Sequence, residues 1–141
     1  LDFYNKDAKE IFKGITDFVK QNKIDFNVYF VLSEDKNSKE EIKLAIAVKK
    51  LYPAKFLDYI NKRLEKIDDL YWVDILDDLG IDYKKIKNFV KSKEIESLLN
   101  DNIKVSRELN IKSGNVILIN NNKIFKIFRF NDKEFKKFFG N

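Results

Sequence analysis

The sequence lacks the two side chains on which most familiar active sites depend. It contains no cysteine and no histidine, so it can form no disulfide, thiolate nucleophile, imidazole base or sulfur-ligated metal site. Carboxylate, Lys, Tyr, Ser and Thr chemistry is left, together with hard cations bound by oxygen ligands. We therefore expect no catalytic residue of the usual kinds, no cofactor and no metal site, and we favour a role other than catalysis.

Glycine, proline and long apolar runs are scarce as well. The four glycines lie apart and the chain has one proline, which excludes a glycine-rich phosphate loop and the standard mode of nucleotide binding. No apolar run approaches the roughly eighteen residues of a membrane span, and no signal peptide is recognisable. The chain begins at Leu1 and contains no methionine, which indicates a processed or trimmed piece of a longer protein.

The net charge of +5 does not come from a basic block. Basic residues alternate with acidic ones, as in KKLYPAKFLDYINKRLEKIDD, residues 49–69. Such interspersion is typical of solvated helix faces rather than of a patch that binds nucleic acid or a membrane surface. A basic nucleic-acid-binding domain is therefore the weakest function that we consider, and we expect no nucleic-acid partner.

Two clusters need a separate interpretation. The five aspartates of residues 68–78 lack the Asp-x-Asp-x-Asp-Gly spacing of a calcium loop, so we interpret them as a solvated helix face.

Phenylalanine alternates with lysine over residues 123–139. This pattern suits stacking on single-stranded nucleic acid, but it equally suits a half-buried strand followed by an amphipathic helix. We favour the structural interpretation, and phenylalanines that prove exposed would form a surface for a homo-oligomer.

Hydrophobic spacing predicts a strand, a helix and a second strand at the start of the chain. LDFY, residues 1–4, and the β-favouring run DFNVYFVLS, residues 25–33, fit strands. Between them, apolar residues recur every three or four positions over about 7–21, which predicts an amphipathic helix. This order favours a parallel βαβ unit.

Helical spacing then continues through a long central block, for which we predict an all-helical insertion at about 38–109. Ser38 and Glu41 are spaced for a capping box at its start. Gly80 followed by Asp82 fits the end of one helix and the cap of the next.

After this block the period changes back to that of strands. Two apolar runs, 115–119 and 123–130, are joined by three asparagines that tolerate positive φ, so they predict an antiparallel hairpin. Asp132 is placed to cap a short final helix. The chain, 1–141, is predicted to form a single domain.

This order of elements resembles an α/β thioredoxin-like fold, a βαβ…ββα central sheet, and the large all-helical insertion resembles the DsbA-like branch of the thiol–disulfide oxidoreductases. The sharpest local resemblance lies in LNIKSGNVILINN, residues 109–121. Members of this branch typically carry L-G-I-x-G-T-P-T-x-V-I-N-G there, with the proline in a cis-proline loop. The matching residues are Leu109, Ile111, Ile117, Leu118, Ile119 and Asn120.

The resemblance places altered residues at both functional positions of the family. The Cys-x-x-Cys positions fall on Asn5 and Ala8, and Asn115 stands at the cis-proline position. Because a cis bond before a residue other than proline costs about 2.5–4 kcal/mol, we expect a trans bond there. The resemblance implies that a degenerate cis-proline loop can bind peptide through Ser113, Gly114, Asn115 and Val116.

We therefore hypothesise a redox-inactive DsbA-like domain that acts as a protein-binding or structural module, with an extended peptide or protein as its partner. The alternative is a thiol–disulfide oxidoreductase whose cysteines lie in a missing segment or a partner chain, or have been replaced. The resemblance implies a periplasmic or otherwise extracytoplasmic location, which the lack of cysteine neither supports nor excludes.

Overall fold

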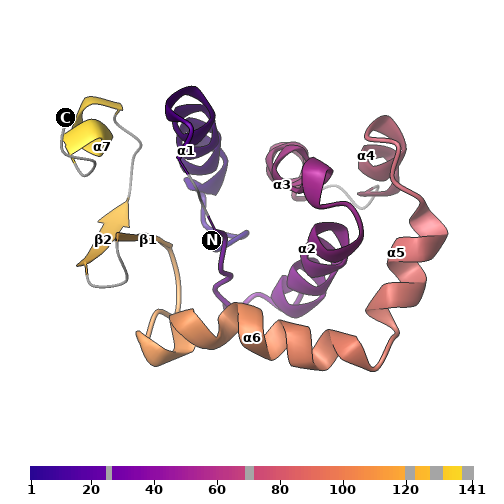
Figure 1. The fold of residues 1–141 in the computed structure, drawn as a ribbon. Coiled ribbons are helices and arrows are strands. Elements are labelled where there is room, and N and C mark those ends of the chain that lie inside the picture. Colours follow the sequence, from indigo (N-terminus) through magenta and orange to yellow (C-terminus); the bar gives the residue numbers. More distant parts are fainter. Residues whose placement is uncertain (25–26, 69–71, 120–122, 128–131, 138–141) are drawn as a thin grey trace.

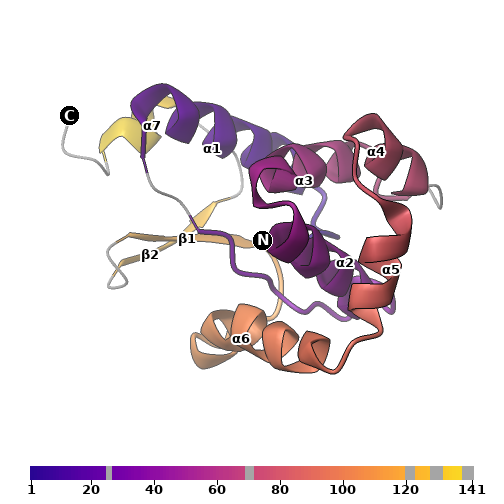
Figure 2. The same cartoon turned by 45° about the vertical axis from the view of Figure 1, so that its right-hand side comes forward.

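The computed structural model describes residues 1–24, 27–68, 72–119, 123–127 and 132–137, most of which are helical. In chain order the elements are α1 (Ala8–Asn22), α2 (Ser38–Leu51), the 3-10 helix η1 (Pro53–Lys55), α3 (Phe56–Glu65), α4 (Trp72–Asp78), α5 (Tyr83–Val90), α6 (Glu94–Glu108), β1 (Asn115–Ile119), β2 (Lys123–Ile127) and α7 (Asp132–Lys137). The β1–β2 hairpin lies at one end of the molecule, and α4 and α5 lie at the other (Figure 1). Helices α1 and α7 lie on one side of the hairpin and α6 on the other (Figure 2).

Helix α1 forms because its apolar residues fall on one face. Ile11, Ile15 and Val19 are among the residues that it buries. The helix ends where Lys23 adopts a left-handed φ of 52° and its backbone N–H donates to the Val19 carbonyl. The predicted helix over about 7–21 is confirmed.

The predicted helical block is confirmed from α2 to α6. Helix α2 lies at its centre, because α3, α5 and α6 all pack against it (Figure 2). Each of the five helices contributes buried apolar side chains to one core, among them Ile42, Ala45, Val48, Tyr59, Ile60, Ile75, Leu76, Ile86, Leu99 and Ile103.

The predicted capping box at the start of α2 is wrong. The Ser38 hydroxyl accepts the backbone N–H of Ser33 at 3.1 Å instead of capping its own helix. The Glu41 carboxylate turns to Arg63 of α3, with Oε1 at 2.7 Å from Nε and Oε2 at 3.0 Å from Nη2. Both Ser38 and Glu41 are buried, so partners from other segments replace the local ones.

The predicted junction between α4 and α5 is confirmed. Gly80 adopts a φ of 69°, a left-handed conformation that favours glycine. The Asp82 side chain accepts the backbone N–H groups of Lys84 at 2.9 Å and of Lys85 at 3.4 Å, which caps α5.

The predicted antiparallel hairpin is confirmed for β1 and β2. Asn115 pairs with Ile127 at its open end and Ile119 with Lys123 at its turn. The three asparagines, 120–122, and the end of the predicted second strand, 128–130, lie outside the described residues. The side chains of the phenylalanines in the tail also lie outside the description, so the predicted oligomer surface there stays a prediction.

The two predicted N-terminal strands are not regular strands among the described residues, so the expected βαβ unit is not confirmed. Residues 1–4 and 27–33 contain no regular strand. Leu1 donates to the Tyr29 carbonyl at 2.6 Å and accepts from the Val31 N–H at 2.8 Å, which is the hydrogen-bond pattern of a single parallel pair.

Helix α6 supplies a physical reason why the second segment lacks a longer ladder. The Phe30 N–H donates to the Asn102 carbonyl at 2.9 Å, and the Phe30 carbonyl accepts the Ser106 hydroxyl at 2.9 Å. A helix therefore takes the backbone bonds of Phe30 that a neighbouring strand would otherwise make.

Candidate functional site

Two segments from opposite ends of the chain meet at the start of β1. The Asn115 side chain joins them, because its Nδ2 donates to Oδ1 of Asn5 at 3.3 Å and its Oδ1 accepts the backbone N–H of Asp2 at 3.1 Å. Asn115 is buried and Asn5 is half-buried. The tertiary structure thus brings together Asn5 and Asn115, which the sequence analysis had assigned to one site.

Asp2 is a site residue that the sequence analysis missed. Its carboxylate accepts the backbone N–H of Tyr4 at 3.1 Å through Oδ1 and that of Gly114 at 2.9 Å through Oδ2. Asp2 is only 3% exposed, and burying a carboxylate costs free energy unless it is hydrogen-bonded. The signal in the sequence was an acid inside the apolar run LDFY.

The polypeptide turns into α1 directly beside this contact. Asn5 Oδ1 also accepts the backbone N–H of Asp7 at 3.0 Å, and its carbonyl accepts the N–H of Ala8 at 3.0 Å. Asn5 therefore fixes the start of the helix. Ala8 is buried in the hydrophobic core, so it offers no polar group to the site.

The turn before β1 combines a glycine in an unusual conformation with an exposed serine. Gly114 has a φ of 82°, and the described residues contain no cis peptide bond, so the predicted trans bond before Asn115 is confirmed. Ser113 is exposed and hydrogen-bonds to no described residue. Val116 pairs with Lys126 in the hairpin, and its side chain lies outside the description.

A buried polar cluster lies behind Tyr4. It is built on the Glu41–Arg63 ion pair, in which both side chains are buried and Arg63 Nη1 also donates to the Lys66 carbonyl at 3.1 Å. Burial, followed by the charge of Glu41, raises the pKa of Tyr4 from 10.0 to about 12. The same two causes raise the pKa of the fully buried Tyr59, whose hydroxyl has no hydrogen-bond partner among the described residues.

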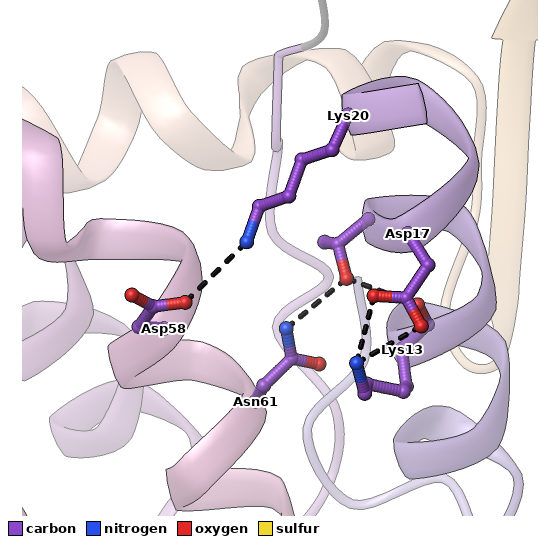
Figure 3. Close-up of polar contacts among 6 residues, drawn as sticks. Lys13, Asp17, Lys20, Asp58 and Asn61 are labelled. Atoms are coloured by element: carbon purple, nitrogen blue, oxygen red, sulfur yellow. Dashed lines mark hydrogen bonds and ion pairs between the residues drawn. The ribbon is translucent and has the colours of Figure 1, made fainter. Parts of the chain in front are cut away.

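Polar contacts hold α1 against the helical insertion (Figure 3). Asn61 Nδ2 of α3 donates to the hydroxyl of the buried Thr16 at 3.1 Å. Lys20 reaches Asp58 of α3 at 3.5 Å on the exposed side of the same interface. These two contacts join α1 to α3.

A shallow depression of about 540 Å³ runs along the outer face of α1. It begins one residue after Asn5, and it is lined by Lys6, Lys9, Glu10, Lys13, Gly14 and Asp17. Gly114 and Asn115 are not among its lining residues.

The chemistry available at this site is hydrogen bonding. The described residues contain no group of His, Asp or Glu side chains arranged to hold a metal ion, and the sequence contains no thiol. The site instead offers asparagine amides, the exposed Ser113 and the buried Asp2. Among the helices of the described part, none is long and apolar enough to cross a membrane.

Comparison with known proteins gives the fold. No known protein family and no curated protein matches the sequence. The structure is similar to the crystal structure of the thiol–disulfide exchange protein alpha-DsbA2 from Wolbachia pipientis, with a TM-score of 0.80 over 97% of this chain and 75% of that chain. The two sequences are 22% identical. The predicted resemblance to a DsbA-like fold is therefore confirmed.

Proposed function

We propose that this chain is a redox-inactive domain of DsbA-like fold that binds an extended peptide or protein segment beside Asn5 and Ser113–Asn115. The observation that carries the proposal is the hydrogen bond between Asn5 and Asn115. The residues that the resemblance assigns to the cysteine motif and to the cis-proline loop are in contact, yet neither segment carries sulfur.

The loss of redox activity follows from the side chains at these positions. Thiol–disulfide exchange requires a thiolate that attacks a disulfide, and the chain supplies none. Asn5 instead accepts the N–H of Asp7 at the start of α1, where a family member would use the helix terminus to stabilise a thiolate. A structural hydrogen bond thus occupies the place of the reactive group.

Peptide binding is supported by the unsatisfied groups of the turn. Ser113 has a backbone N–H, a carbonyl and a hydroxyl with no partner among the described residues. An extended peptide gains affinity by pairing its backbone with such groups. The depression that begins at Lys6 gives the remainder of the peptide room along α1.

The proposal also includes the order of strands in the sheet and the cellular compartment of the protein. Residues 1–3 and 27–33 would take the places of the first two strands of a thioredoxin-like central sheet, next to β1. The paired bonds of Leu1 with Tyr29 and Val31, and those of Asp2 with Gly114 and Asn115, support this order. A single domain over 1–141 in an extracytoplasmic compartment accords with the similarity in fold.

An NMR titration of the chain with reduced, carboxymethylated α-lactalbumin, an extended protein without free thiols, tests the proposal. We expect the largest shifts at Asn5 and Ser113–Asn115. Asn115→Ala removes the bonds to Asn5 and Asp2 and should weaken binding by about tenfold, the equivalent of about 1.4 kcal/mol. Asn100→Ala, at an exposed position of α6, is the matched control. Binding that both variants retain would place the peptide elsewhere.

The alternative function is thiol–disulfide exchange, which the similarity to alpha-DsbA2 favours. It requires cysteines outside the present sequence. Mass spectrometry of the protein isolated from its source, after alkylation of its thiols, would find them. A Cys-x-x-Cys segment adjacent to Leu1 would support the alternative, whereas a natural protein without cysteine would eliminate it.

A further inference from the structure

One segment of the chain departs from the interspersed charges seen elsewhere. Residues 68–82 contain six acids and no base, and residues 83–93 contain five lysines and no acid. The acids are Asp68, Asp69, Asp74, Asp77, Asp78 and Asp82, and the bases are Lys84, Lys85, Lys87, Lys91 and Lys93. The switch in sign coincides with the junction between α4 and α5.

The charges form one acidic and one basic face. Asp74, Asp77 and Asp78 are exposed on α4 at offsets of three and four, so they share one side of the helix. Lys84 and Lys87 of α5 are likewise exposed at an offset of three, and Lys91 extends this face beyond the helix end. We call these two sets the acidic face and the basic face.

Neither face is neutralised within the part of the chain that the structure describes. None of their six side chains forms an ion pair with any residue of the described part. Yet α4 and α5 pack against each other, with the rings of Trp72 and Tyr83 5.5 Å apart. Adjacent helices thus present opposite charges to solvent instead of pairing them.

We propose that a second copy of this chain docks on this surface with two-fold symmetry, so that the acidic face of each subunit meets the basic face of the other. A two-fold interface uses the same patch twice, so the patch must be complementary to itself. A patch of one sign would repel its own copy, whereas adjacent faces of opposite sign satisfy the requirement. A membrane or nucleic acid would bring negative charge against the acidic face as well.

Two half-buried aromatic rings hold α4 and α5 together. Trp72 and Tyr83 lie at the α4–α5 junction and pack against the hydrophobic core. Trp72 shares the buried side of α4 with Ile75 and Leu76, so the acidic face on the other side of the helix stays open to solvent. The surface lies at the opposite end of the molecule from β1 (Figure 1), so the dimer leaves the Asn5–Asn115 site free and does not depend on the proposed function.

Sedimentation velocity of the unmodified chain over a range of concentrations is the first test. We expect a reversible dimer at about 0.01 M NaCl that dissociates at about 1 M, because the screening length falls from about 30 Å to about 3 Å. A monomer at every concentration in low salt would overturn the proposal.

Charge reversal then tests which surface is used. Lys84→Glu/Lys87→Glu/Lys91→Glu and Asp74→Lys/Asp77→Lys/Asp78→Lys should each be monomeric, with at least about a tenfold weaker self-association. An equimolar mixture of the two should form a heterodimer, because one then presents only acidic and the other only basic faces.

The control Lys36→Glu/Lys50→Glu/Lys62→Glu reverses three other exposed lysines and should dimerise like the unmodified chain. A dimer that all three variants retain, or a mixture that stays monomeric, would place the interface elsewhere. A monomer that binds phosphatidylserine vesicles or single-stranded DNA through Lys84, Lys87 and Lys91 would identify an anionic surface as the occupant and overturn the dimer.

Discussion

The carboxylate of Asp2 accepts the backbone N–H of Gly114 at 2.9 Å, which joins residues 112 positions apart in the sequence. The same carboxylate accepts the N–H of Tyr4, and Asn115 binds the backbone of Asp2 in return. The start of the chain is therefore tied to the turn before β1 by reciprocal bonds, and the candidate site is built on this connection.

Replacement of Asp2 by Asn should destabilise the fold although it preserves the shape of the side chain. One of the two acceptor oxygens becomes an NH₂ group that faces a backbone donor, and a buried donor without a partner costs about 1–3 kcal/mol. Urea unfolding measures this loss. Asp101→Asn, at an exposed position of α6, is the control, and equal stability of the two variants would contradict the role given to Asp2.

Removal of one partner of the Glu41–Arg63 pair should be among the most damaging single changes. Both side chains are buried, so Glu41→Ala leaves an uncompensated guanidinium and should cost about 3–5 kcal/mol. The double variant Glu41→Leu/Arg63→Met should recover most of this loss, because apolar side chains of similar size can replace a buried ion pair.

Glu40→Ala is the matched control for Glu41→Ala. Glu40 is adjacent in sequence but exposed, with its carboxylate 3.6 Å from Lys43, so its loss should cost less than about 1 kcal/mol. If the double variant is no more stable than Glu41→Ala, apolar contacts cannot replace the Glu41–Arg63 pair. The pair would then be required for the packing of α2 on α3.

Stability should fall in alkaline solution as Tyr4 ionises. Its folded-state pKa is raised from 10.0 to about 12, so the unfolded chain loses this proton at lower pH than the folded chain. The contribution is therefore complete below pH 10 and is lost as pH rises toward about 12. Thermal unfolding across this range, beside Tyr4→Phe, measures the effect, and a pH dependence unchanged in the variant would assign it to other groups.

The Asn61–Thr16 hydrogen bond between α1 and α3 should contribute more to the stability of the fold than the exposed Lys20–Asp58 ion pair. Asn61→Ala leaves the buried Thr16 hydroxyl without its donor and should cost about 1 kcal/mol. Lys20→Ala removes a contact between exposed side chains and should change stability by less than about 0.5 kcal/mol. Chemical denaturation of both variants compares them directly, and a larger effect of Lys20→Ala would reverse this ranking.

Helices and the hairpin were predictable because each depends on a pattern inside its own segment. The apolar stripe of α1, the helical spacing of 38–109 and the two runs of the hairpin predicted elements that the structure contains. The meeting of Asn5 with Asn115 was also anticipated, but through the family resemblance rather than through any local pattern.

The failures share one physical cause, which is competition between hydrogen-bond partners. Ser38 and Glu41 have the spacing of a capping box, yet Ser33 and Arg63 are their partners in the folded chain. Phe30 lies in a β-favouring run, but α6 takes its backbone bonds. Spacing in the sequence shows which hydrogen-bond partners lie within reach along the same segment. It cannot show which groups from distant segments lie nearby in the folded chain.

The sequence by itself determined that these 141 residues carry no thiol, and it determined the order of helices and the hairpin, because composition and periodicity are properties of local segments. Tertiary structure alone decided that Asp2 binds Gly114, that Glu41 pairs with Arg63, and that the charges of α4 and α5 stay unpaired among the described residues. These outcomes depend on desolvation and on contacts between distant segments, which exist only after the chain has folded.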